Sequence, residues 1–144
     1  MKKLLSRKVV STVVGSTLML LSSVLWAETA VIVNPANDSP ITAEDVAKLY
    51  LGKTKSFPNG KPATPLERTE GSEIRSGFLE KIVDKSESQM KAYWSRLIFT
   101  GKGVPPDSAE TDKEVKELIA KDPGKIGYID VTSVDDSVKV VLTF

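Results

Sequence analysis

The chain has 144 residues, with 20 Lys and Arg against 19 Asp and Glu, and this size and composition suit a single globular domain. It contains no His and no Cys, which excludes Ser-His-Asp and Cys-His relays, His- or Cys-ligated metal sites, iron–sulfur clusters and disulfides. We therefore expect no cofactor and no metal. A Ser-Lys nucleophile or a pair of carboxylates would be the remaining route to an enzyme.

The first 27 residues have the three parts of a secretory signal peptide. Basic residues precede residue 9, an uncharged stretch rich in Val and Leu runs over 9–27, and Ala27 offers a small residue before the cleavage point. We predict that residues 1–27 are removed on export and that residues 28–144 form the domain. An uncleaved anchor helix is the alternative, because the uncharged stretch is almost long enough to span a bilayer.

Removal of this leader changes the charge of the protein. Four bases and no acid leave with it, so residues 28–144 carry 16 bases against 19 acids, a net charge of −3. Nucleic-acid-binding domains are normally basic, so we expect no nucleic-acid partner. Export of a domain without cysteine fits a bacterial envelope protein, because a small extracellular eukaryotic domain more often carries disulfides. We therefore expect a periplasmic location.

From residue 28 onward, the apolar spacing predicts alternating strands and helices. Strands are expected over 29–33, 63–67, 126–130 and 138–143, where β-branched residues cluster between turn signals. Helices are expected to begin at Thr42, Ser72, Ser86 and Thr111, and the second is expected to continue to Val83. This order favours βαβ units in one α/β domain with about four strands and four helices.

The third predicted helix has the clearest amphipathic pattern in the chain. Its apolar residues recur at helical spacing: Met90, Tyr93, Trp94, Leu97 and Ile98. We interpret this stripe as part of the core and not as a ligand-stacking surface.

The junction between the second strand and second helix is the strongest candidate for a binding site. A helix start presents unpaired backbone N–H groups to an anion. Gly71 permits close approach of a ligand, Ser72 offers a hydroxyl, and Arg68 and Arg75 offer guanidinium donors. A purely structural role, with Ser72 as a helix cap and Arg75 as a solvated residue, is the alternative. The segment 48–75 carries a net charge of +3, which would favour an anionic ligand.

Four blocks of sequence resemble a known family. They are residues 32–35 (Ile-Val-Asn-Pro), 49–53 (Leu-Tyr-Leu-Gly-Lys), 89–101 (containing Lys-Ala-Tyr-Trp) and 123–130 (containing Gly-Lys-Ile-Gly-Tyr). Together they resemble short exported proteins of the type 2 periplasmic-binding-protein superfamily that are similar to phosphate ABC-transporter substrate-binding proteins. The resemblance implies a periplasmic solute-binding protein for phosphate or a related oxyanion. It also implies an ABC permease or another envelope protein as partner.

The resemblance also implies which residues bind the ligand. Full-length phosphate receptors bind phosphate with an Arg-Ser-Asp-x-Ser-Gly-Thr-like segment at a helix start. Here the matching positions are Arg68, Thr69, Glu70 and Ser72, whereas Glu73 and Ile74 replace the Gly-Thr pair. The expected ligand-binding residues are therefore Arg68, Thr69, Gly71, Ser72 and Arg75.

The length of the chain leaves two functional classes open. Residues 28–144 match the size of one lobe of a type 2 periplasmic-binding-protein fold, and such receptors close two lobes around their ligand. A homodimer or another protein could supply the second half of the cleft. The alternative is a non-transport interaction or sensory module built on a binding-protein lobe. We do not expect an enzyme, because Ser72 has no visible base.

Overall fold

A four-stranded sheet forms the centre of the protein. The computed structural model describes residues 28–144, so the predicted signal peptide lies outside the described residues. The sheet order is β2 (Thr64–Pro65), β5 (Lys125–Asp130), β1 (Thr29–Val33), β6 (Lys139–Thr143). Two shorter strands, β3 (Glu67–Arg68) and β4 (Ser108–Ala109), pair separately. The expected α/β class, with a sheet of four strands and four helices, is confirmed.

The direction of the central strands differs from the expectation. β1 is antiparallel to both neighbours, with Thr29 opposite Asp130 and Ala30 opposite Thr143, and only β2 runs parallel to β5. The prediction of βαβ units is therefore wrong for the centre of the sheet. The physical reason is that β1 inserts between β5 and β6 and pairs with both in the antiparallel direction. Backbone hydrogen bonds of 2.9 and 3.0 Å between Thr29 and Phe144 extend its pairing with β6.

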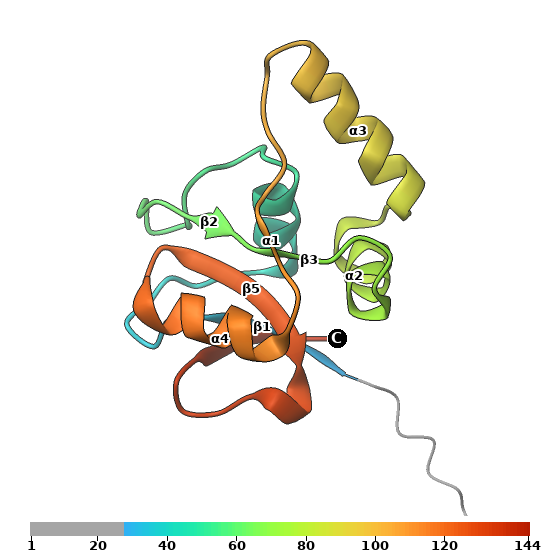
Figure 1. The fold of residues 1–144 in the computed structure, drawn as a ribbon. Helices are drawn as coiled ribbons and strands as arrows, with labels where there is room; N and C mark the ends of the chain where they lie inside the picture. The colour runs from blue at the N-terminus through green and yellow to red at the C-terminus, as the bar shows by residue number, and fades with distance from the viewer. Residues whose placement is uncertain (1–27) are drawn as a thin grey trace, which may run out of the picture.

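Both faces of the sheet are covered by helices (Figure 1). β1 is buried on both sides, and its side chains alternate between two apolar clusters. Val31 and Val33 face the cluster that includes residues of α1 (Ala43–Tyr50), α2 (Glu73–Phe78) and α3 (Glu87–Phe99). Ala30 and Ile32 face α4 (Asp112–Lys121). The alternation fixes the register of β1, because a slip of one residue would exchange the two faces.

Three helices begin where their capping residues predict. Thr42 and Asp45 form a capping box at α1, Ser86 and Gln89 form another at α3, and the Thr111 hydroxyl accepts from the backbone N–H of residue 114 at α4. No helix within residues 28–144 is long and apolar enough to cross a membrane.

The segment between the second strand and the third helix is less regular than expected. The predicted strand over 63–67 is divided into β2 and β3 at Leu66. The predicted helix from Ser72 to Val83 is divided into α2 and the π-helical turn η1 (Leu79–Val83), which ends at Asp84 with a φ of 57°. β4 was not predicted, and a two-residue strand is too short to produce a periodic signal.

Helix α3 leaves the body of the domain, and its C-terminal end lies farthest from the sheet (Figure 1). Its first half is anchored, because Met90 and Trp94 are buried and the Tyr93 hydroxyl donates to the Leu51 carbonyl at 2.6 Å. Ile98, by contrast, is 53% exposed. Leu97 is half-buried against the core, so of the stripe that we interpreted as core only Ile98 lies outside it.

After α3, the segment 100–107 returns to β4. The short 3-10 helix η2 (Val131–Ser133) connects β5 to the last turn of the chain.

Candidate functional site

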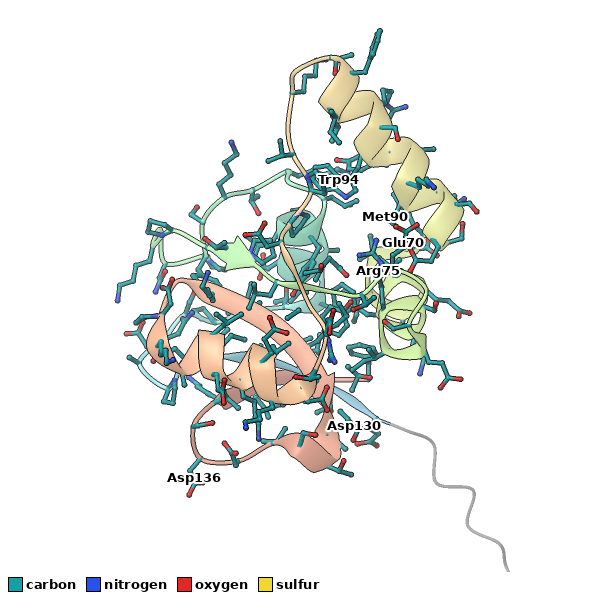
Figure 2. All side chains as sticks on the ribbon, viewed as in Figure 1. Glu70, Arg75, Met90, Trp94, Asp130 and Asp136 are labelled. Atoms are coloured by element: carbon teal, nitrogen blue, oxygen red, sulfur yellow. The ribbon has the colours of Figure 1, made fainter. Side chains whose placement is uncertain are left out.

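The candidate site lies where β3 turns into α2. β3 pairs in parallel with β4, which places Glu67 opposite Ser108 and Arg68 opposite Ala109. The chain then reverses at Gly71, whose φ of +82° belongs to the left-handed region that glycine adopts without strain. Ser72 occupies the cap position of α2. Figure 2 shows Glu70 and Arg75 beside Met90, beneath the first turns of α3.

Gly71 and Arg75 already bind an anion, and that anion is a side chain of the protein. The Gly71 backbone N–H donates to Glu87 Oε1 at 3.1 Å, and Arg75 Nε donates to Oε1 and Oε2 of the same carboxylate at 2.9 and 3.1 Å. Glu87 is the first residue of α3 and comes from outside the predicted segment. The arrangement holds a carboxylate with one backbone donor and one guanidinium, which are the donors that a bound oxyanion requires.

Arg75 is also paired with a buried carboxylate behind it. Its Nη1 lies 3.0 Å from Glu67 Oε2, and the side chains are 14% and 5% exposed respectively. Burial would lower the pKa of Arg75, but the adjacent Glu67 and Glu87 carboxylates outweigh burial and raise it. The guanidinium is therefore a permanent cation held between two carboxylates. It is not the solvated helix residue of the alternative interpretation.

Glu67 is the most deeply buried carboxylate of this cluster. Its Oε2 accepts from the Tyr128 hydroxyl at 2.8 Å and from the Arg68 backbone N–H at 3.1 Å. Its Oε1 has no hydrogen-bond partner among residues 28–144. Burial raises the pKa of Glu67, although Arg75 and the Tyr128 hydrogen bond act in the opposite direction.

The structure turns the Arg68 guanidinium away from Gly71 and Arg75. Its donors reach the carbonyls of Ala109, Glu110 and Tyr128 at 3.1–3.2 Å and the Asp112 carboxylate at 2.7 Å. The side chain is 6% exposed. Arg68 thus connects β3 with β4, the start of α4 and β5, and it supports the site from behind.

Thr69 and Ser72 lie at the rim of the site. Ser72 does not cap α2 with its side chain, because its hydroxyl donates to the Thr69 carbonyl at 2.7 Å. Thr69 itself is exposed. Of the expected ligand-binding residues, the structure therefore brings Gly71 and Arg75 together on the Glu87 carboxylate. Ser72 and Thr69 contact each other instead.

A small cavity opens beside these residues, under α3. It has a volume of about 220 Å³, and its charged lining residues are Glu70, Arg75, Glu87 and Lys91. Nothing in the sequence indicated that Glu67 and Glu87 belong to the site. An acid in the first turn of a helix, such as Glu87, is ordinarily explained by the helix dipole alone. No group of His, Cys, Asp or Glu residues within 28–144 is arranged to hold a metal ion.

No family model matches the sequence. Several solved structures are similar to this chain in fold. A putative phosphate ABC transporter substrate-binding protein with bound phosphate from Clostridium perfringens is 24% identical with a TM-score of 0.63. An ABC-type phosphate transport receptor from Vibrio cholerae is 21% identical with a TM-score of 0.61, and PstS from Borrelia burgdorferi is 21% identical with a TM-score of 0.55.

These similarities cover 80% of this chain but 45%, 46% and 47% of the three structures respectively. The chain thus spans less than half the length of the receptors it resembles. At this level of identity the similarity shows the fold, which is that of the periplasmic-binding-protein type. It confirms the resemblance to phosphate receptors stated from the sequence blocks.

Proposed function

We propose that this protein is an exported, non-enzymatic binding protein of the phosphate-receptor type, which binds phosphate or a related oxyanion at the start of α2. The observation that carries this proposal is the Glu87 carboxylate, which Gly71 and Arg75 hold as they would hold an external anion. The similarity to phosphate receptors supports the same ligand class.

In this proposal the ligand displaces Glu87. The departing carboxylate would free the Gly71 N–H and the Arg75 Nε, and the rotatable Ser72 hydroxyl and the exposed Thr69 lie beside them. Arg68 positions β3 and does not touch the ligand. Because Glu67 and Glu70 stay near Arg75, they oppose a second anion, and we expect the unmodified protein to bind phosphate weakly.

The cellular part of the proposal rests on the N-terminal sequence. Cleavage of residues 1–27 would deliver the domain to the periplasm. There an ABC permease or another envelope protein would be the partner, and a second copy of the chain could complete the cleft. N-terminal sequencing of the exported protein should begin at or near Glu28, and retention of Met1 in the membrane fraction would contradict it.

Calorimetric titration of phosphate, with sulfate for comparison, tests the site. The exported protein, Glu87→Gln and Glu80→Gln are compared. The last variant is a matched control because it removes an exposed acid that has no contact with Gly71 or Arg75. We expect Glu87→Gln to raise phosphate affinity at least tenfold, because it removes the charge that competes with the ligand, and Glu80→Gln to leave it unchanged.

The absence of heat in both the exported protein and Glu87→Gln would overturn the oxyanion proposal. A second candidate function would then remain, a non-transport interaction or sensory module on a binding-protein lobe. The specific observation in its favour is that Glu87 and Glu67 already occupy the donors of Arg75. This module would require no small ligand, and its anion-binding segment would serve to attach α3.

A further inference from the structure

The protruding end of α3 combines exposed apolar side chains with basic residues. Among residues 28–144, the large apolar side chains most exposed to solvent are Phe99 at 92%, Val104 at 78% and Ile98 at 53%. All three lie at the end of α3 or in the turn that follows it. In Figure 1 this end of α3 is the part of the protein farthest from the sheet. Single exposed apolar residues are ordinary, but exposed apolar residues grouped in one patch mark an interaction site.

The chain segments around this end carry only positive charge. Residues 51, 52 and 55 line a pocket together with the end of α3 and the turn that follows it. The segments 51–55 and 92–106 contain four bases and no acid, whereas the remainder of 28–144 contains 12 bases and 19 acids. Arg96 lies in the last turn of α3 and Lys102 lies in the turn that follows, and both are exposed. The ion pairs within residues 28–144 include neither of them. A domain with a net negative charge thus carries one basic end.

We propose that the end of α3 and the turn over 100–104 bind the surface of an anionic phospholipid bilayer. Phe99, Ile98 and Val104 would enter the boundary between headgroups and acyl chains, and Arg96 and Lys102 would contact lipid phosphates. Long basic side chains suit this role, because their stems lie along apolar surface while their charges remain in water.

A bilayer fits this surface better than an acidic protein does. A standard protein interface takes about 800 Å² from each partner, and its strongest contacts lie in well-packed pockets near the centre. The α3 end is a narrow projection, and a bilayer accepts such a projection without a matching shape. The proposal does not rest on phosphate binding at the start of α2, because Gly71 and Arg75 hold Glu87 in the first turn of α3, whereas Phe99 is the last residue of that helix.

Sedimentation with lipid vesicles tests this proposal on the exported protein. Vesicles of phosphatidylcholine alone are compared with vesicles of phosphatidylcholine and phosphatidylglycerol in equal parts, at low and high salt. We expect binding to the anionic vesicles and its loss at high salt, because the attraction is largely electrostatic. Binding to both kinds of vesicle alike would overturn the proposal.

Two surface variants and a control identify the contact. Phe99→Ser should weaken binding about tenfold by removing the inserted ring. Lys102→Glu should weaken it by at least about fivefold, the loss expected for one basic residue near an anionic surface. Lys113→Glu makes the same charge change on α4, where the side chain is 83% exposed, and should have much less effect.

All variants share the same N-terminus, so any residual leader contributes equally to each. Unchanged binding by Phe99→Ser and Lys102→Glu would overturn the proposal, and so would an equal loss with Lys113→Glu. If the protein does not bind anionic vesicles but binds an acidic protein through Phe99, the proposal of a bilayer as partner is wrong. Circular dichroism should show that the variants remain folded, since all three side chains are exposed.

Discussion

Tyr128 donates its phenolic hydrogen to the buried carboxylate of Glu67 over 2.8 Å. The tyrosine ring stacks on Phe78 with centroids 4.0 Å apart, so the donor cannot turn toward solvent without disturbing the core. Burial and the adjacent Glu67 raise the pKa of Tyr128, which keeps the hydroxyl protonated and able to donate. A carboxylate thus lies under the candidate anion site, and its charge state affects both stability and binding.

Protonation of Glu67 should add to the stability of the protein in mild acid. The free energy of unfolding there should be higher than it would be if only the other carboxylates of the protein titrated. Burial raises the pKa of Glu67 above its ordinary value of 4.5, so the folded protein holds this proton to a higher pH than the unfolded chain does. The contribution of Glu67 to stability is therefore present below 4.5 and decreases as pH rises from 4.5 through the raised pKa.

Denaturant unfolding across this pH range measures the effect. Glu67→Gln removes the titrating group, so the decrease in unfolding free energy with rising pH should become smaller in the variant. Asp45 and Asp130 have lowered pKa values because of hydrogen bonds from Thr42 and Thr132, and they contribute the opposite slope at lower pH in both proteins. Identical pH profiles for the two proteins would show that Glu67 has no raised pKa.

Replacement of Arg68 by lysine should destabilise the fold, although the charge is conserved. A single ammonium cannot reach the Asp112 carboxylate and the carbonyls of Ala109, Glu110 and Tyr128 together, so buried acceptors lose their donors. We expect a loss of about 3 kcal/mol in unfolding free energy. Arg96→Lys, on the exposed face of α3, should change it by less than about 0.5 kcal/mol. Equal stability of both variants would contradict the structural role of Arg68.

Gly127 should not tolerate alanine, because α4 packs directly on it. An added Cβ would lie 2.7 Å from Val115 Cγ1 and 3.0 Å from Ile119 Cδ1. We expect Gly127→Ala to cost roughly 1–3 kcal/mol in thermal or chemical unfolding. The same change at Gly77, in α2, meets no atom within 4 Å and should instead stabilise the protein by roughly 0.5–1 kcal/mol. A neutral Gly127→Ala would show that α4 can shift away from β5.

Local sequence rules predicted most of the elements but not their directions. The capping residues Thr42, Ser86 and Thr111 act through bonds three residues away, and so the sequence alone reveals these helix starts. The antiparallel placement of β1 depends on pairing with strands about a hundred residues later. The side-chain pattern within a strand does not indicate which strands it will pair with or in which direction.

The candidate site shows the same division between local and distant interactions. Gly71 and Ser72 were found because a turn and a helix start have a local signature. The assignments of the Arg68 and Arg75 donors depend on Asp112, Glu67 and Glu87, and the sequence offers no rule that pairs a given arginine with a given carboxylate. The sequence also did not indicate that Ile98 is exposed, because the amphipathic pattern of α3 continues past the point where the helix leaves the core.

The two halves of α3 should therefore respond differently to the same substitution. Met90 is 2% exposed and packs in the apolar cluster that includes the buried residues of α1, so Met90→Ala should cost roughly 2–5 kcal/mol in unfolding free energy. Phe99 lies in the same helix but is 92% exposed, and Phe99→Ala should change stability by less than about 0.5 kcal/mol. Chemical denaturation of both variants measures this contrast. A large loss with Phe99→Ala would place its ring in the folded core, and the end of α3 would then be unavailable to any partner.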